Sequence, residues 1–287
     1  SSEKGSNLTA YFLSFLLHRT QSTTVRMANA LNVFKMFYST ILLIFSTTII
    51  MGLIFTKQTS LSSDVHPWLA FFVIWAAVLW LSMVEGGQAS LVGLVPVQRD
   101  LYKDSHPIAY LNTAISNKGD NLDRYLLGRQ FMVVLIVFVI NLSGSPLPGA
   151  ELWGFPKIIT DIFLVTGFAM ILYAAMIGQL NSQVNAAHCM LDYIDTYFAL
   201  FTLWVAMAIE FTGILHASYL VHMLVAALAG KKVESLEEPR TGIASLWFWL
   251  RCLLSLAVLV GCFVVTLTAL FNGQTTMWPG VPKAVSV

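Results

Sequence analysis

The sequence predicts an all-α protein that crosses a membrane several times, and two observations carry that prediction: its composition and its long apolar runs. Of the 287 residues, 57% are hydrophobic and only 11% are charged, and the mean hydropathy is +0.73. A soluble domain has about 25% charged residues. The net charge of +1 gives no reason to expect a nucleic-acid partner, and three scattered cysteines do not form a disulfide framework.

Six apolar runs predict about six transmembrane helices, since one crossing takes about 20 helical residues. They cover residues 36–55, 67–97, 125–143, 158–178, 196–229 and 243–271. We expect three parts: a cytoplasmic segment with an interfacial helix at 1–35, a five-helix unit at 36–229, and a loop with a sixth helix at 230–287. The chain lacks an initiator methionine and stops soon after the sixth run, so we expect it to be part of a longer protein.

The distribution of lysine and arginine favours a cytoplasmic N-terminus, because cytoplasmic loops carry an excess of these residues. With that orientation the inner segments hold eight of them: Lys4, Arg19, Arg26, Lys35, Arg99, Lys103, Lys118 and Arg124. The outer loops hold five, and three of those five lie in the last loop, which argues against the assignment: Lys57, Lys157, Lys231, Lys232 and Arg240.

The stretch Glu85-Gly86-Gly87-Gln88 places polar chemistry inside the second apolar run. A carboxylate at membrane depth is costly, so Glu85 is a candidate functional residue, and Gln88 shares its helix face three residues on. A helix over 67–97 is roughly 46 Å long against a hydrocarbon core of about 30 Å, so it must tilt, break or overrun. Gly86-Gly87 is the predicted break, where freed carbonyls would coordinate a cation as in some transporters.

A second polar group, Gly128-Arg129-Gln130, opens the third apolar run. Neighbouring residues point about 100° apart on a helix, so Arg129 and Gln130 cannot serve one ligand in the same way. We expect Gln130 to face the same cavity as Gln88. Arg129 either pairs with Glu85 or extends to the membrane interface. If the pair serves only to hold the two helices together, its role is purely structural.

Three further features leave alternatives open. Glu210, followed by His216 and His222, is either part of an ion relay or a single hydrogen bond between helices. Cys189 and Asp192 are the remaining metal-ligand candidates, but a closed site needs about four ligands, so we expect a turn and no metal. The amides from Gln179 to Asn185 are typical of a hydrated helix end. Enzyme motifs and cofactor signatures are absent from the sequence, so we expect no enzyme.

Together these residues resemble the silicon (silicic acid) transporter family of diatoms. Glu85–Gln88 and Gly128–Gln130 are similar to that family's Glu-Gly-x-Gln and Gly-Arg-Gln pair. Other similar stretches are 117–124, Cys189-Met-Leu-Asp192, 237–242 and 266–278. The resemblance implies ten helices in two inverted five-helix repeats, followed by a coiled coil. This chain has one motif pair, so its sixth span would open the second repeat, and we expect this part alone not to transport.

The resemblance also implies an activity, which is sodium-coupled uptake of silicic acid at the plasma membrane by alternating access, in support of silica biomineralisation. The implied substrate-binding residues are Glu85, Gly86, Gly87, Gln88, Gly128, Arg129 and Gln130. We expect sodium as the coupling ion, with Glu85 and Glu210 as candidates, and leave open a homo-oligomer in the bilayer. The alternatives are a non-transporting sensor or assembly subunit on the same scaffold, and a passive silicic acid channel.

Overall fold

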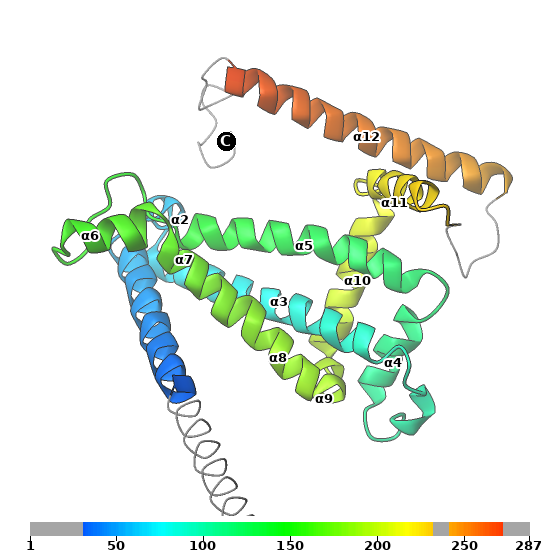
Figure 1. Cartoon of the computed structure of the whole chain (residues 1–287), viewed down its shortest axis with the longest axis horizontal. Helices are drawn as coiled ribbons and strands as arrows, with labels where there is room; N and C mark the ends of the chain where they lie inside the picture. The colour runs from blue at the N-terminus through cyan, green and yellow to red at the C-terminus, as the bar shows by residue number, and fades with distance from the viewer. Residues whose placement is uncertain (1–30, 232–240, 272–287) are drawn as a thin grey trace, which may run out of the picture.

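The structure, a computed structural model, describes residues 31–231 and 241–271, and these residues form helices joined by short loops (Figure 1). Within these ranges there is no β-strand, only an isolated bridge between Thr59 and Pro146. The predicted interfacial helix at 1–35 lies mostly outside the described residues. The all-α class is confirmed.

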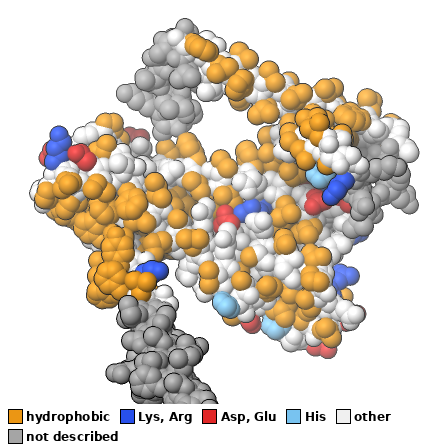
Figure 2. Space-filling view, in the orientation of Figure 1, with side chains coloured by type: hydrophobic (Ala, Val, Ile, Leu, Met, Phe, Trp, Pro, Cys, Tyr) orange, Lys and Arg blue, Asp and Glu red, His pale blue; other side chains and the backbone are white. Residues whose placement is uncertain are grey.

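Four of the described helices are long and apolar enough to cross a membrane: Leu31–Phe55, α3 (Pro67–Gly93), α5 (Asn121–Gly144) and α12 (Gly242–Phe271). A fifth candidate is a bent pair that joins Lys157–Val165 to Phe168–His188 at 52°. Figure 2 shows hydrophobic side chains over much of the surface of the first helix and of α12. Such surfaces suit a protein whose solvent is lipid.

The remaining elements are short. They are α2 (Ser60–Asp64), η1 (Arg99–Leu101), α4 (Pro107–Ser116), α6 (Lys157–Thr160), η2 (Asp161–Val165), α7 (Phe168–Tyr173), η3 (Ala174–Leu180), α8 (Asn181–His188), α9 (Met190–Ile194), α10 (Tyr197–Phe211) and α11 (Ala217–Leu228). Segments η2 and η3 are π-helical, and η3 runs on into α8.

Helix α3 lies at the centre, against α5 on one side and η3, α8 and α9 on another (Figure 1). Its start is fixed locally: Pro67 occupies the first turn, where its missing N–H is not needed, and the His66 ring accepts from the Trp68 amide. Ile74, Leu81 and Val84 are fully buried in the core.

The predicted break at Gly86-Gly87 is wrong, because α3 is helical from Pro67 through Gly93. At about 40 Å the helix is still longer than the hydrocarbon core is thick, so it must tilt or extend beyond one membrane interface. Both glycines are buried against tyrosine side chains: a Cβ on Gly86 would lie 2.3 Å from the Tyr193 ring, and one on Gly87 would lie 3.3 Å from the Tyr125 hydroxyl. They permit close packing without unwinding the helix.

The fifth run, predicted as one long span over 196–229, is two short helices. The chain turns between α10 and α11 at residues 212–216, where Gly213 has φ +86°, a left-handed conformation that favours glycine. Helix α12 is attached to this turn by Ser255, whose hydroxyl accepts from the Ala217 amide and donates to the Ile214 carbonyl. This attachment brings α11 and α12 beside the N-terminal half of α5.

Candidate functional site

Glu85 is the centre of a buried polar network that joins three helices. An Arg129 Nη2 on α5 donates to Glu85 Oε2 on α3 at 2.8 Å, and the two side chains are only 8% and 6% exposed. Gln183 Nε2 on α8 donates to the same oxygen at 2.9 Å. Hydrogen bonds to an ionised group contribute about 1.5–3 kcal/mol each, which helps to offset the cost of burying this carboxylate.

The network continues from Arg129 to Gln130. Arg129 Nη1 donates to Gln130 Oε1 at 3.0 Å, so the amide oxygen of Gln130 is engaged and its NH₂ group is the end that remains to bind elsewhere. Two polar atoms of the ion pair lack a hydrogen-bond partner among the described residues: Arg129 Nε, which is buried, and Glu85 Oε1. Buried polar atoms are normally paired, so Arg129 Nε favours a ligand or water as its partner.

A cavity of about 570 Å³ lies beside this network and is lined by Gln88, Arg129 and Gln130. Gln88 makes no hydrogen bond within the described part of the chain, so both groups of its amide are available to a ligand. Helices α5, α11 and α12 complete the wall with Asp120, Asp123, Arg124, Leu126, Leu127, Ser218, Tyr219, His222, Met223 and Phe248. Glu85 does not line the cavity in this conformation and lies behind Arg129.

The glycines of both predicted motifs serve the packing that holds the site together. Gly128 lies directly against α10, where an added Cβ would be 1.9 Å from the Ala206 carbonyl oxygen. Gly86 lies against Tyr193, whose hydroxyl donates to the Ser82 carbonyl at 2.8 Å. Burial raises the pKa of Tyr193, and the Ser182 hydroxyl opposes that shift, so the phenol stays protonated as a donor at neutral pH.

Glu210 belongs to a separate polar cluster. It is buried, it accepts a hydrogen bond from the Tyr219 hydroxyl at 3.1 Å, and His216 Nε2 lies 3.7 Å from the same oxygen. A smaller cavity of about 200 Å³ is lined by Glu210 together with Arg124 and Arg251. Arg124, Tyr219 and Phe248 line both cavities, so the two are neighbours, but the structure does not bring Glu85 and Glu210 to one site.

The Cys189–Asp192 stretch leads into contacts between α9 and α4. Asp192 Oδ1 lies 3.3 Å from His106 Nε2, and Asp195 Oδ1 accepts from the amides of Ile108 and Ala109 in the first turn of α4. Cys189 is exposed and free. Within residues 31–231 and 241–271 no group of three or more His, Cys, Asp or Glu side chains is placed to hold a metal.

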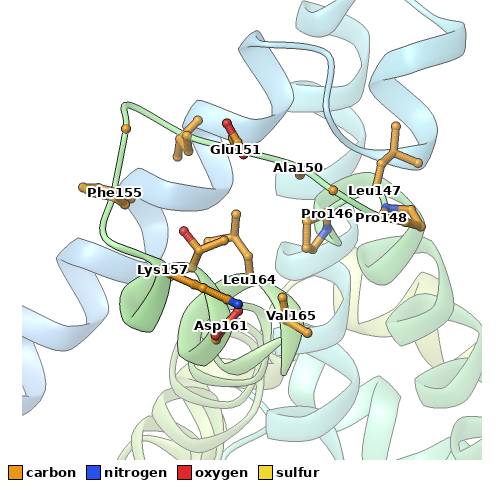
Figure 3. A pocket seen from close by; sticks show the side chains of 14 residues that line it. Pro146, Leu147, Pro148, Ala150, Glu151, Phe155, Lys157, Asp161, Leu164 and Val165 are labelled. Atoms are coloured by element: carbon orange, nitrogen blue, oxygen red, sulfur yellow. The ribbon is translucent and has the colours of Figure 1, made fainter.

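A larger cavity, of about 790 Å³, lies elsewhere, beyond the C-terminal end of α5 (Figure 3). Residues 146–155 form one wall, and α6 and η2 form the other with Lys157 and Asp161. None of the predicted site residues lines it. The 570 Å³ cavity at the N-terminal end of α5 is therefore the better candidate binding site of the three, because residues from both motifs line it.

Sequence reasoning missed Gln183 and the wall supplied by α11. Gln183 lies in the amide-rich stretch interpreted as a hydrated helix end, and nothing in its spacing indicates which amide faces Glu85. Residues Ser218 to Met223 reach the cavity because the chain turns at Gly213, a turn that one continuous predicted span does not contain.

Membrane-length helices around a buried ion pair and a polar cavity define an integral membrane protein with an internal polar site. A family model described as Silicon transporter matches residues 27–287. The chain therefore belongs to the silicon transporter family, a family of transporters. Comparison with curated proteins and comparison with solved structures find no match for this chain.

Proposed function

We propose that this protein binds silicic acid in the cavity that Gln88, Arg129 and Gln130 line, and that it takes part in sodium-coupled uptake. The observation that carries the proposal is the convergence of two motifs, from α3 and α5, on one cavity with amide groups facing it. Silicic acid is a neutral tetrahedron of four hydroxyls at ordinary pH, and each hydroxyl both donates and accepts. Amides also do both, so they satisfy such a ligand without requiring charge on it.

The ion pair has a positioning role in this proposal. Glu85 holds Arg129, and Arg129 holds the amide oxygen of Gln130, so the Gln130 NH₂ group is directed to donate to a silicic acid oxygen. Gln88 accepts from or donates to another hydroxyl. A small shift of Arg129 would expose Glu85 Oε1, and a substrate hydroxyl donating to that carboxylate would make the strongest single contact.

We place sodium coupling at Glu85, because it is bonded to Arg129, which lines the proposed binding cavity. Sodium, a hard cation, favours carboxylate and carbonyl oxygens, and Glu85 Oε1 accepts no hydrogen bond within the described residues. Both carboxylates have guanidinium groups close by, Arg129 at Glu85 and Arg124 and Arg251 beside Glu210, so charge alone does not separate the two candidates. We keep Glu210 as the alternative.

Alternating access has structural support in two cavities at opposite ends of α5 and in two bends of the chain, at Gly167 and at Gly213. Hinges are a few residues that absorb backbone changes, and both glycines have positive φ. Rocking at these bends would open one cavity and close the other. We further propose a plasma-membrane location with a cytoplasmic N-terminus.

The test is silicic acid uptake by liposomes that contain the intact protein, with and without an inward sodium gradient. Gln88→Ala and Gln130→Ala should each weaken uptake, while Gln98→Ala, at an exposed glutamine outside the cavity, should not. Uptake that ignores the sodium gradient would favour a passive channel. Absence of uptake by the intact, folded protein would favour a sensor or assembly subunit.

A further inference from the structure

One face of α3 is tied to the segment from η3 to α9 by three polar contacts. The Ser82 hydroxyl donates to the Ile177 carbonyl at 3.3 Å, and the Tyr193 hydroxyl donates to the Ser82 carbonyl at 2.8 Å. The third contact is Gln183 to Glu85 at 2.9 Å. Because the first two fix the register of the segment against α3, the Gln183 side chain is presented directly to the buried carboxylate.

The backbone that carries Gln183 is unusual. Residues Ala174–Leu180 form a π-helix that continues into α8, and π-helical turns are rare and occur frequently at functional sites. The inserted turn rotates α8 relative to the preceding helix, so it decides which of the amides between Gln179 and Asn185 faces α3. Gln183 is the one that contacts Glu85.

We propose that Gln183 is a positioning residue for silicic acid binding, although it lies outside both motifs and outside the cavity lining. The chain of contacts runs from Gln183 to Glu85, from Glu85 to Arg129 and from Arg129 to Gln130, which lines the cavity. Gln183 holds Glu85 Oε2 in place, and this fixes the direction in which Arg129 presents Nη1. The inference rests on the proposed function, because it assumes that Gln130 contacts the substrate.

A positioning role makes a different prediction from a structural one. Gln183 is exposed, so its replacement by an apolar side chain removes little packing, and what is lost is one of the two hydrogen bonds that Glu85 accepts. Glu85 keeps its bond from Arg129 in that variant but gains freedom to rotate. The consequence is a less defined Gln130 amide, which weakens substrate binding without slowing the transport step, whereas a purely structural role would lower the stability alone.

The experiment compares uptake kinetics of the intact protein carrying Gln183→Leu, Gln183→Asn or the control Gln179→Leu. Gln183→Leu should raise KM for silicic acid by roughly tenfold with the maximal rate near wild type, because the Gln130 amide is held less firmly, and the loss of one hydrogen bond to a charged group should also lower the thermal stability. Gln183→Asn, which keeps the amide but shortens its reach, should raise KM as well. Gln179→Leu, a neighbouring amide with no hydrogen bond to α3, should behave as wild type.

A double-mutant cycle then tests the route. On a Gln130→Ala background, Gln183→Leu should add less than about twofold, because the residue through which it acts is gone. An unchanged KM in Gln183→Leu, or a full additional loss on the Gln130→Ala background, would overturn the inference while leaving the binding cavity in place. An unchanged KM in Gln130→Ala itself would instead overturn the proposed function.

Discussion

Removal of the Glu85 carboxylate should destabilise the protein far more than removal of the whole ion pair. Arg129 and Glu85 are 8% and 6% exposed, so Glu85→Leu leaves a guanidinium buried without its counter-charge. Breaking one side of a buried pair costs about 3–5 kcal/mol. At a shift of about 2–4 °C per kcal/mol for a chain of this size, the melting temperature should fall by on the order of 10 °C.

The double variant Glu85→Leu/Arg129→Met separates charge burial from packing. Replacing a buried pair by apolar residues of similar volume is often neutral, so the double variant should recover most of the lost stability. The assay is thermal unfolding of the intact protein in detergent. Asp192→Asn serves as the control at an exposed pair, where the cost is about 1 kcal/mol or less. The reasoning would be refuted if Glu85→Leu had the melting temperature of the wild type, or if the double variant had a melting temperature as low as that of Glu85→Leu.

Three other predictions concern packing, capping and ion coupling. Gly128→Ala should abolish folded, monodisperse protein, because its Cβ would collide with the Ala206 carbonyl. The control Gly261→Ala, with open space around the added Cβ, should be neutral. If the two variants gave the same size-exclusion profile, the packing argument would be contradicted. Asp195→Ala should lower the stability of the protein by about 1 kcal/mol, because two backbone amides in the first turn of α4 lose their acceptor. Thermal unfolding measures this loss. An unchanged melting temperature would show that water replaces the carboxylate as acceptor. Glu210→Gln should leave the sodium dependence of uptake intact. If this variant lost the sodium dependence, the coupling site would be Glu210 and not Glu85.

The long, uniform helices follow from the sequence because apolar length alone determines them. The runs that begin at Pro67 and Tyr125 correspond to α3 and α5, and the run at 243–271 corresponds to α12. Local signals were misleading where tertiary packing outweighs them. Gly86 and Gly87 indicate a break when read alone, but Tyr193 and Tyr125 pack against them and the helix continues.

The candidate site could be predicted only in part, for a similar reason. The spacing of Glu85 and Gln88 on one helix face is local, and so is the divergence of Arg129 and Gln130. Whether Gln183 reaches Glu85 depends on the π-helical turn at Ala174–Leu180 and on the register of that segment against α3. Neither is encoded in a periodic pattern. The second wall of the cavity likewise depends on the turn at Gly213.

Thiol accessibility at positions 88 and 130 tests the central claim most directly. On an intact protein with Cys189, Cys252 and Cys262 replaced, Gln88→Cys or Gln130→Cys is exposed to a water-soluble thiol reagent with and without silicic acid. The expected result is modification at both positions that silicic acid slows, while Val134→Cys, on the exposed apolar surface of α5, stays unmodified in membranes. Cysteines at 88 and 130 that resist the reagent, or react at a rate that silicic acid does not change, would contradict a shared substrate cavity.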